Sequence, residues 1–205
     1  MKTSILKISL CCVFALTVSV MSNYSFAQAT ATKQDDTKTE EAPAPIPVTL
    51  ADGNVKFSAT GTWKSVKPKI GMIAAEMQIP KVGEDENNGR LTVMAAGGSV
   101  EANITRWRGQ FAQPDGSDTA DKTKTEKMEI AGQTVHMVDI SGTFMDSPGG
   151  PRGAKIERAN YRMMAAIVET ADYGKLFIKL YGPKATIDKN ADHFKAMIKS
   201  MEVAE

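Results

Sequence analysis

The stretch "YRMMAAIVETADYGKLFIKLYG", Tyr161–Gly182, has the clearest strand pattern of the chain. Two apolar runs are separated by "ADYG", so we expect two strands that pair as a hairpin. A strand with two apolar faces is typical of a sheet that is covered on both sides. The first run has such faces: Met163, Ala165 and Ile167 on one side, and Met164, Ala166 and Val168 on the other. The chain must therefore supply a covering layer for each face.

Apolar residues alternate with a period of two elsewhere in the chain, which predicts further strands. One such strand runs from Met72 to Ile79, and the turn "GEDENNGR" leads into another from Leu91 to Ala95. In "TEKMEIAGQTVHMVDISGTF" a tight turn at "AGQ" joins two strands, the second of which covers Val135–Phe144. The Gly- and Pro-rich "MDSPGGPRGAKIERAN" that follows is expected to form a loop.

Two stretches have helical spacing instead. Val100, Ile104, Trp107 and Phe111 are four, three and four residues apart, as on one face of a helix, and Ser99 is a suitable N-cap. A second helical stripe lies near the C-terminus and consists of Ile187, Ala191, Phe194, Ile198 and Met201. The order is thus strand pairs, helix, strand pairs, helix. It predicts an α+β fold, an antiparallel sheet flanked by helices as an α/β/α sandwich.

The N-terminal region has the pattern of an export signal followed by a spacer. Lys2 and Lys7 precede an apolar run that is too short to span a bilayer, and small residues follow, so residues 1–27 are expected to be a signal peptide cleaved after Ala27 or Ala29. Residues 28–47 are rich in Thr, Ala, Asp, Glu and Pro and are expected to be a disordered linker. Residues 48–205 then form a single domain. The protein is expected to be periplasmic or secreted, without membrane insertion once the signal is removed.

Cysteine content and charge exclude several classes of function. The two cysteines, Cys11 and Cys12, lie within the signal, so the mature chain is expected to have no disulfide and no thiolate site. The whole chain has 25 basic and 24 acidic residues; loss of Lys2 and Lys7 leaves 23 against 24, a net charge of −1. No overall basic field therefore attracts the protein to nucleic acid or to an anionic membrane.

Three segments resemble the PsbP-like family, which includes extrinsic proteins of photosystem II and DcrB-type periplasmic proteins. They are "VKFSATGTWKSV" near the start, "IAGQTVHMVDISG" in the middle, and "GKLFIKLYGP" followed by "HFKAMIKSMEV" at the end. The resemblance covers most of Val55–Val203 and implies an α/β/α sandwich. It also implies a non-enzymatic accessory or binding role, because members of this fold are mostly of that kind. No metal or cofactor residues of the family map onto this chain.

No assembled catalytic set is visible in the sequence. Neither Ser99 nor Ser141 lies in a nucleophile motif. His136 is expected within a strand on the side of Val138 and Ile140, as a partnered core or edge histidine. His193 is expected to face solvent. An alternative is a hydrolase that uses carboxylates such as Asp139 or Glu169 in a cleft between sheet and helix.

Metal binding is a second alternative, with a poor ligand count. "EDENNG", Glu84–Gly89, has some calcium-loop character but lacks the acid expected at the twelfth position, so we interpret it as a solvated turn. Ten methionines remain after signal cleavage, and thioethers bind Cu(I). Met72 and Met77 would point to opposite faces of their strand, and so would Met163 and Met164. This arrangement favours core filling instead of a shared copper site. No metal and no cofactor are therefore expected.

The first helical segment offers the candidate binding residues Asn103, Arg106, Arg108 and Gln110. Asn103, Arg106 and Gln110 share the side opposite Trp107, and Arg108 adjoins it. The hydrated outer face of a helix would look the same, but arginine side chains also suit a carboxylate-bearing partner or a small anion. The sequence thus favours an exported, non-catalytic binding or accessory domain, with a protein or a small anionic ligand as partner.

Overall fold

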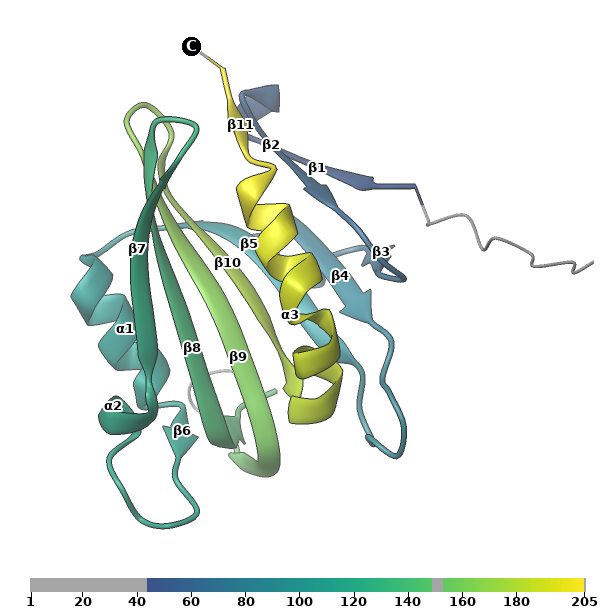
Figure 1. The fold of residues 1–205 in the computed structure, drawn as a ribbon, viewed down its shortest axis with the longest axis vertical. Coiled ribbons are helices and arrows are strands. Elements are labelled where there is room, and N and C mark those ends of the chain that lie inside the picture. The colour runs from purple at the N-terminus through teal and green to yellow at the C-terminus, as the bar shows by residue number, and fades with distance from the viewer. Residues whose placement is uncertain (1–43, 149–152, 205) are drawn as a thin grey trace, which may run out of the picture. The chain divides into compact units, whose positions relative to one another are not determined.

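The computed structural model describes residues 44–148 and 153–204, which contain a large and a small antiparallel sheet and three α-helices (Figure 1). The large sheet has the order β3-β4-β5-β10-β9-β8-β6, and β7 pairs with a different stretch of β8. All of its pairings are antiparallel. Its strands are β3 Lys64–Val66, β4 Ala75–Ile79, β5 Gly89–Ala96, β6 Phe111–Ala112, β7 Lys124–Ile130, β8 Gln133–Asp146, β9 Ile156–Thr170 and β10 Gly174–Pro183.

The small sheet brings the two ends of the described chain together. It has the order β1-β2-β11, with β1 Ile46–Leu50, β2 Val55–Ala59 and β11 Glu202–Val203. The helices are α1 Val100–Arg108, α2 Thr119–Lys122 and α3 Lys184–Lys199, with a short 3-10 helix η1 at Ala51–Gly53. None of the helices described has the length and apolar character needed to cross a membrane.

The central hairpin has the predicted form, because β9 pairs with β10 from Tyr161 to Thr170. Met164, Ala166 and Val168 belong to a core shared with α3 and the small sheet, and we call this side the α3 face. The opposite side, with Met163, Ala165 and Ile167, packs with α1, and we call it the α1 face. The prediction of a sheet with two buried faces is therefore confirmed.

The predicted α/β/α sandwich is only partly correct. Strands dominate the structure, and the helical layers are thin: α1 has nine residues, and α3 shares its side of the sheet with β1 and β2. The small sheet was not expected as a separate layer. Its apolar residues Val55, Phe57 and Ala59 alternate with exposed ones, so one face of β2 can pack beside α3.

The first helix is shorter than predicted. It ends at Arg108 with Gly109 as C-cap, and Phe111 lies in β6, paired with Phe144 of β8. Phe111 still packs into the same cluster as Trp107, so its apolar character reflected burial and not helix continuation. The predicted N-cap is confirmed, because the Ser99 hydroxyl accepts a 3.1 Å hydrogen bond from the Ala102 N–H.

Several predicted boundaries shift by a few residues. β4 begins at Ala75 and not at Met72, while β8 and β9 extend to Asp146 and back to Ile156, into the segment expected to be a loop. The last two residues of the predicted linker, Ile46 and Pro47, belong to β1. The predicted signal peptide and residues 28–43 of the linker lie outside the described residues.

Candidate functional site

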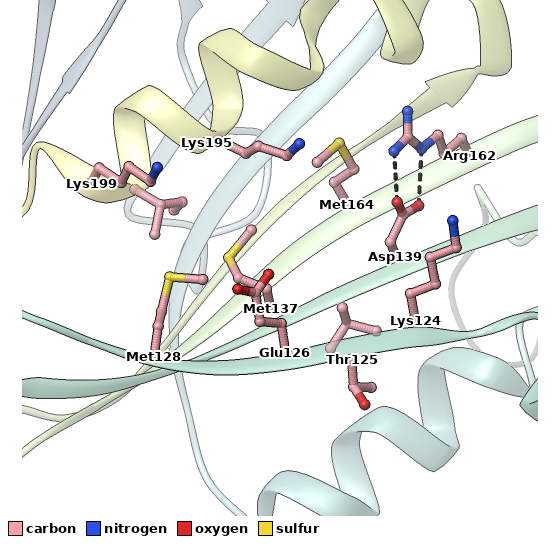
Figure 2. A pocket seen from close by; sticks show the side chains of 12 residues that line it. Lys124, Thr125, Glu126, Met128, Met137, Asp139, Arg162, Met164, Lys195 and Lys199 are labelled. Atoms are coloured by element: carbon pink, nitrogen blue, oxygen red, sulfur yellow. Dashed lines mark hydrogen bonds and ion pairs between the residues drawn. The ribbon is translucent and has the colours of Figure 1, made fainter.

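A groove of about 750 Å³ lies on the α3 face, between α3 and β7, over the parts of β7, β8 and β9 that α3 does not cover (Figures 1 and 2). Its position follows from the lengths of the elements. The large sheet extends through β9 and β8 to β7, while α3 and the small sheet pack over β9, β10 and β5. The outer strands on this face are therefore only partly covered: Val135 of β8 belongs to the core, while Met128 and Met137 are half-buried.

Three methionines form the floor of the groove, one from each of three neighbouring strands: Met128 of β7, Met137 of β8 and Met164 of β9. Met128 is paired with Val135, and Met137 with Ala166, so each methionine is the diagonal neighbour of the next on one face of the sheet. Diagonal neighbours lie within reach of long side chains. Met164 is 2% exposed, whereas Met128 and Met137 are half-buried and accessible.

Lysines stand at the rim. Lys195 and Lys199 are four residues apart on α3, so both face the groove, and Lys124 approaches from β7 (Figure 2). Lys195 is 3.8 Å from Asp192, while Lys124 and Lys199 form no ion pair with any described residue. Glu126 is the carboxylate that lines the groove without a bound cation. The rim therefore has an excess of positive charge.

An ion-pair network closes one end of the groove. Arg162 donates to both carboxylate oxygens of Asp139, from Nε at 2.9 Å and from Nη2 at 2.6 Å, and its Nη1 donates to Asp188 of α3 at 2.8 Å. Burial favours a higher pKa for Asp188, but hydrogen bonds from Lys184 and Arg162 lower it overall. The hydrogen bond to Asp139 raises the pKa of Arg162, which stays charged. This network fixes α3 against β8 and β9.

The sequence-predicted binding residues do not form one surface. Asn103 is 3% exposed, so its placement on the outer face was wrong: its amide donates to the carbonyls of Gly97 and Ser99 at 3.0 and 2.8 Å. Arg106 is exposed and donates to the Asn103 side chain at 2.7 Å. Arg108 is half-buried, and its buried Nε has no hydrogen-bond partner in the part of the chain that the structure describes.

Gln110, the fourth of these residues, leads to a lysine that the sequence analysis did not single out. Gln110 accepts a 3.4 Å hydrogen bond from Lys179 of β10. The Lys179 ammonium lies 5.3 Å from the ring centre of Trp107 and 5.7 Å from that of Tyr181. Burial, and then the charges of Arg106 and Arg90, lower the pKa of Lys179 to about 8. The sequence does contain a signal for Lys179: it stands between Ile178 and Leu180 in an apolar strand, and buried strands seldom contain a lysine.

The two histidines lie as predicted. His136 is on the α1 face with Val138 and Ile140, and its Nε2 is 2.9 Å from Glu169 Oε2. The hydrogen bond to His136 lowers the pKa of Glu169, so this carboxylate is ionised at neutral pH. His193 is exposed and lies 3.1 Å from the Thr60 hydroxyl.

The acidic turn that was compared with a calcium loop stabilises a helix. Asp85 accepts hydrogen bonds from the backbone N–H and the hydroxyl of Thr186, at 3.0 and 2.6 Å, in the first turn of α3. Helix N-termini have unpaired N–H groups, and a carboxylate is a favourable partner for them. Within residues 44–148 and 153–204, no cluster of three His, Cys, Asp or Glu side chains is arranged to hold a metal ion.

Comparison with known proteins shows a similarity of fold. No family model matches this chain, and no curated protein matches it. Among solved structures, it is similar to cyanobacterial PsbP from Synechocystis sp. PCC 6803, with 11% identity over 78% of this chain and 92% of that one, at a TM-score of 0.48. It is also similar to LpqN, a protein involved in cell envelope biogenesis of Mycobacterium tuberculosis, with 6% identity over 82% and 94% of the two chains and a TM-score of 0.45. The first of these structures bears the name of the family that the three sequence segments resemble.

Proposed function

We propose that this protein is a non-catalytic binding domain that acts outside the cytoplasm, and that its groove between α3 and β7 holds an amphiphile with an acidic headgroup. One observation carries the proposal: Lys124 and Lys199, which pair with no carboxylate among the described residues, stand beside accessible methionine side chains in the same groove. The extracytoplasmic location rests on the export signal expected at residues 1–27.

The floor suits an apolar chain of variable shape. Methionine side chains are unbranched and polarisable, so they adapt to different apolar surfaces at little cost. Met128 and Met137 are half-buried, and Ile198 of α3 adds a further apolar wall. An apolar chain lying here would remove these thioether groups from water, which is favourable in proportion to the area buried.

The rim suits an anion. Lys195 and Lys199 extend from one side and Lys124 from the other, so a carboxylate or phosphate above the methionines would meet ammonium groups from two elements (Figure 2). Lysine is a flexible point charge that adapts to either headgroup. Asp139 does not oppose this, because Arg162 already neutralises it.

Asp139 and Glu169, the carboxylates considered for hydrolysis, hold neighbouring side chains in place and are not suited to proton transfer. Asp139 lines the groove, but both of its oxygens accept hydrogen bonds from Arg162. Glu169 is bound to His136 and Lys175, and its lowered pKa keeps it ionised. A general acid at neutral pH requires the opposite shift, toward a higher pKa.

Calorimetric titration with dodecanoate, kept below its micellar concentration, tests the proposal. We expect the purified protein to bind dodecanoate and the double variant Lys195→Gln/Lys199→Gln to bind about tenfold more weakly, since each lost charge contact is worth about 0.5–1 kcal/mol. Lys189→Gln, an exposed lysine of the same helix outside the groove, is the matched control and should leave the affinity unchanged.

Two results would contradict the proposal. One is the absence of dodecanoate binding by the unaltered protein, and the other is equal binding by the Lys195→Gln/Lys199→Gln and Lys189→Gln variants. Arg106→Ala separates the groove from the sequence-predicted patch, of which Arg106 is the exposed member. If Arg106→Ala abolishes binding and the lysine variants do not, the anion site lies on α1.

A further inference from the structure

Three exposed apolar residues follow one another in residues 64–72, which comprise β3 and the start of the segment that joins it to β4; β3 is an edge strand of the large sheet (Figure 1). Val66 is 36% exposed, Ile70 is 52% exposed and Met72 is 71% exposed. Among the described residues, the fourth large apolar side chain in this class is Ile156, at 42% in β9. Single exposed apolar side chains are ordinary, but a local cluster of them marks an interaction surface.

The fold itself does not need these apolar residues. Neither Ile70 nor Met72 belongs to a core cluster or to a strand. Both residues belong to one turn, which is closed by a 3.0 Å hydrogen bond from the Ile73 N–H to the Ile70 carbonyl. The segment therefore presents them to the surroundings of the protein.

The same segment has a strong local positive charge. Lys64, Lys67 and Lys69 are exposed and form no ion pair with any of the residues described. No acidic residue occurs between Asp52 and Glu76. Glu76, which is paired with Val66 across the strands, is bound by Arg90 at 2.8 and 3.0 Å and leaves the lysines uncompensated. The balanced charge of the whole chain conceals this patch.

We infer that residues 64–72 form an interfacial contact with a bilayer that contains anionic lipids. In this contact Ile70 and Met72 enter the boundary between headgroups and acyl chains, and the three lysines meet lipid phosphates. Basic residues near an anionic surface are worth about 1 kcal/mol each, and buried apolar side chains add to the affinity. Such a contact lies on the surface and involves no spanning segment.

A bilayer fits this segment better than a folded protein partner does. A stable protein interface buries about 800 Å² on each side, more than a nine-residue loop provides by itself. Interfacial binding needs only a few apolar side chains with cations beside them, and it requires no shaped counterpart. The loop and the groove consist of different residues, so either proposal can fail while the other stands.

Vesicle flotation with the purified protein tests the inference. We expect binding to vesicles of phosphatidylglycerol and phosphatidylcholine in equal parts, and little binding to phosphatidylcholine alone. Ile70→Ser/Met72→Ser should weaken binding about tenfold, because partial burial of these side chains is worth more than 1 kcal/mol. Ile156→Ser removes an exposed isoleucine elsewhere and should leave binding unchanged.

The lysines and the apolar residues are tested separately. Lys67→Gln/Lys69→Gln should also weaken binding and make it less sensitive to salt. The inference is overturned if the unaltered protein floats with neither kind of vesicle, or if Ile156→Ser is as harmful as Ile70→Ser/Met72→Ser. Binding that depends on the lysines but survives Ile70→Ser/Met72→Ser would be simple adsorption, and it would overturn the insertion of Ile70 and Met72.

A fluorescence measurement reports insertion directly. Trp63 and Trp107 are 3% and 1% exposed, so Met72→Trp would add an indole at a position that is open to solvent. Its emission should shift to shorter wavelength when phosphatidylglycerol vesicles are added, because the indole leaves water. An unshifted emission spectrum in the presence of bound vesicles would rule out insertion at this position.

Discussion

Asp85 shows how one side chain from a loop can fix a helix that is distant in sequence. Its carboxylate accepts two hydrogen bonds from Thr186, which is fully buried in the first turn of α3. We expect Asp85→Ala to lower the free energy of unfolding by about 1–2 kcal/mol, because the N–H and the hydroxyl would lose their partner. Urea denaturation measures this. Glu86→Ala, an exposed acid of the same turn, is the control, and equal effects of the two variants would contradict the role of Asp85.

Lys179 makes stability depend on pH. Its pKa is about 8 in the folded protein and about 10.5 in the unfolded chain, so the unfolded state binds more protons between these values. Stability should therefore rise with pH from about 8 to 10.5, and below pH 8 the full cost of the half-buried charge remains. We expect Lys179→Met to raise the free energy of unfolding at pH 7 by about 1–3 kcal/mol.

Urea denaturation at pH 7 and above pH 10.5 tests the direction of this pH dependence. The difference between Lys179→Met and the unaltered protein should shrink at the higher pH, since the lysine is then neutral in both states. A constant difference across this range would show that the effect comes from packing on Trp107 and Tyr181 and not from the charge.

At the scale of the element, α1 is held by an internal polar contact as well as by its apolar face. The buried Asn103 amide donates to two carbonyls of the preceding turn, and its oxygen accepts from Arg106. We expect Asn103→Ala to destabilise the protein by about 1–3 kcal/mol, because the hydrogen bonds of the buried Asn103 side chain to the Gly97 and Ser99 carbonyls and to Arg106 are lost. Thr105→Ala, an exposed position of the same helix, should change stability little. Thermal unfolding would show the difference, and similar melting temperatures for both variants would contradict it.

For the whole described unit, the C-terminal residues close the structure. β11 pairs with β2, the Ala204 N–H donates to the Asn54 carbonyl at 2.8 Å, and Met201 is 4% exposed. Truncation of the chain after Ser200 should lower the free energy of unfolding by about 3 kcal/mol or more, because the shortened chain lacks a buried methionine and one strand of the small sheet. Glu202→Ala, an exposed change within β11, is the control for urea denaturation. Unfolding of both at the same urea concentration would show that β11 contributes little.

The local patterns were sufficient to predict the hairpins and the helical stripes. Periodicity reports which side chains are buried, and it placed the two faces of β9 and the partnered His136 correctly. It erred at Phe111 because an apolar residue at helical spacing can also be buried in a strand. It erred at Asn103 because an amide that binds nearby backbone carbonyls looks in sequence like a surface residue.

The groove could not be predicted in this way. In the sequence, each methionine can be compared only with its near neighbours in the chain, and these favour core filling. Met128, Met137 and Met164 instead meet through the registers of β7 with β8 and of β8 with β9. The lysines of α3 face them because the helix packs across the other half of the same sheet face (Figure 2).

The antiparallel strands, the two helical stripes and the two buried faces of the sheet could be inferred from the amino-acid sequence, because each follows from the spacing of apolar residues along a few turns or strands. Contacts between distant segments could not: the lysines above the methionines, Asp85 on α3, and the small sheet next to the helix. These depend on strand register and on which part of a face a layer leaves open, and both are set by the packing of segments that are far apart in the chain.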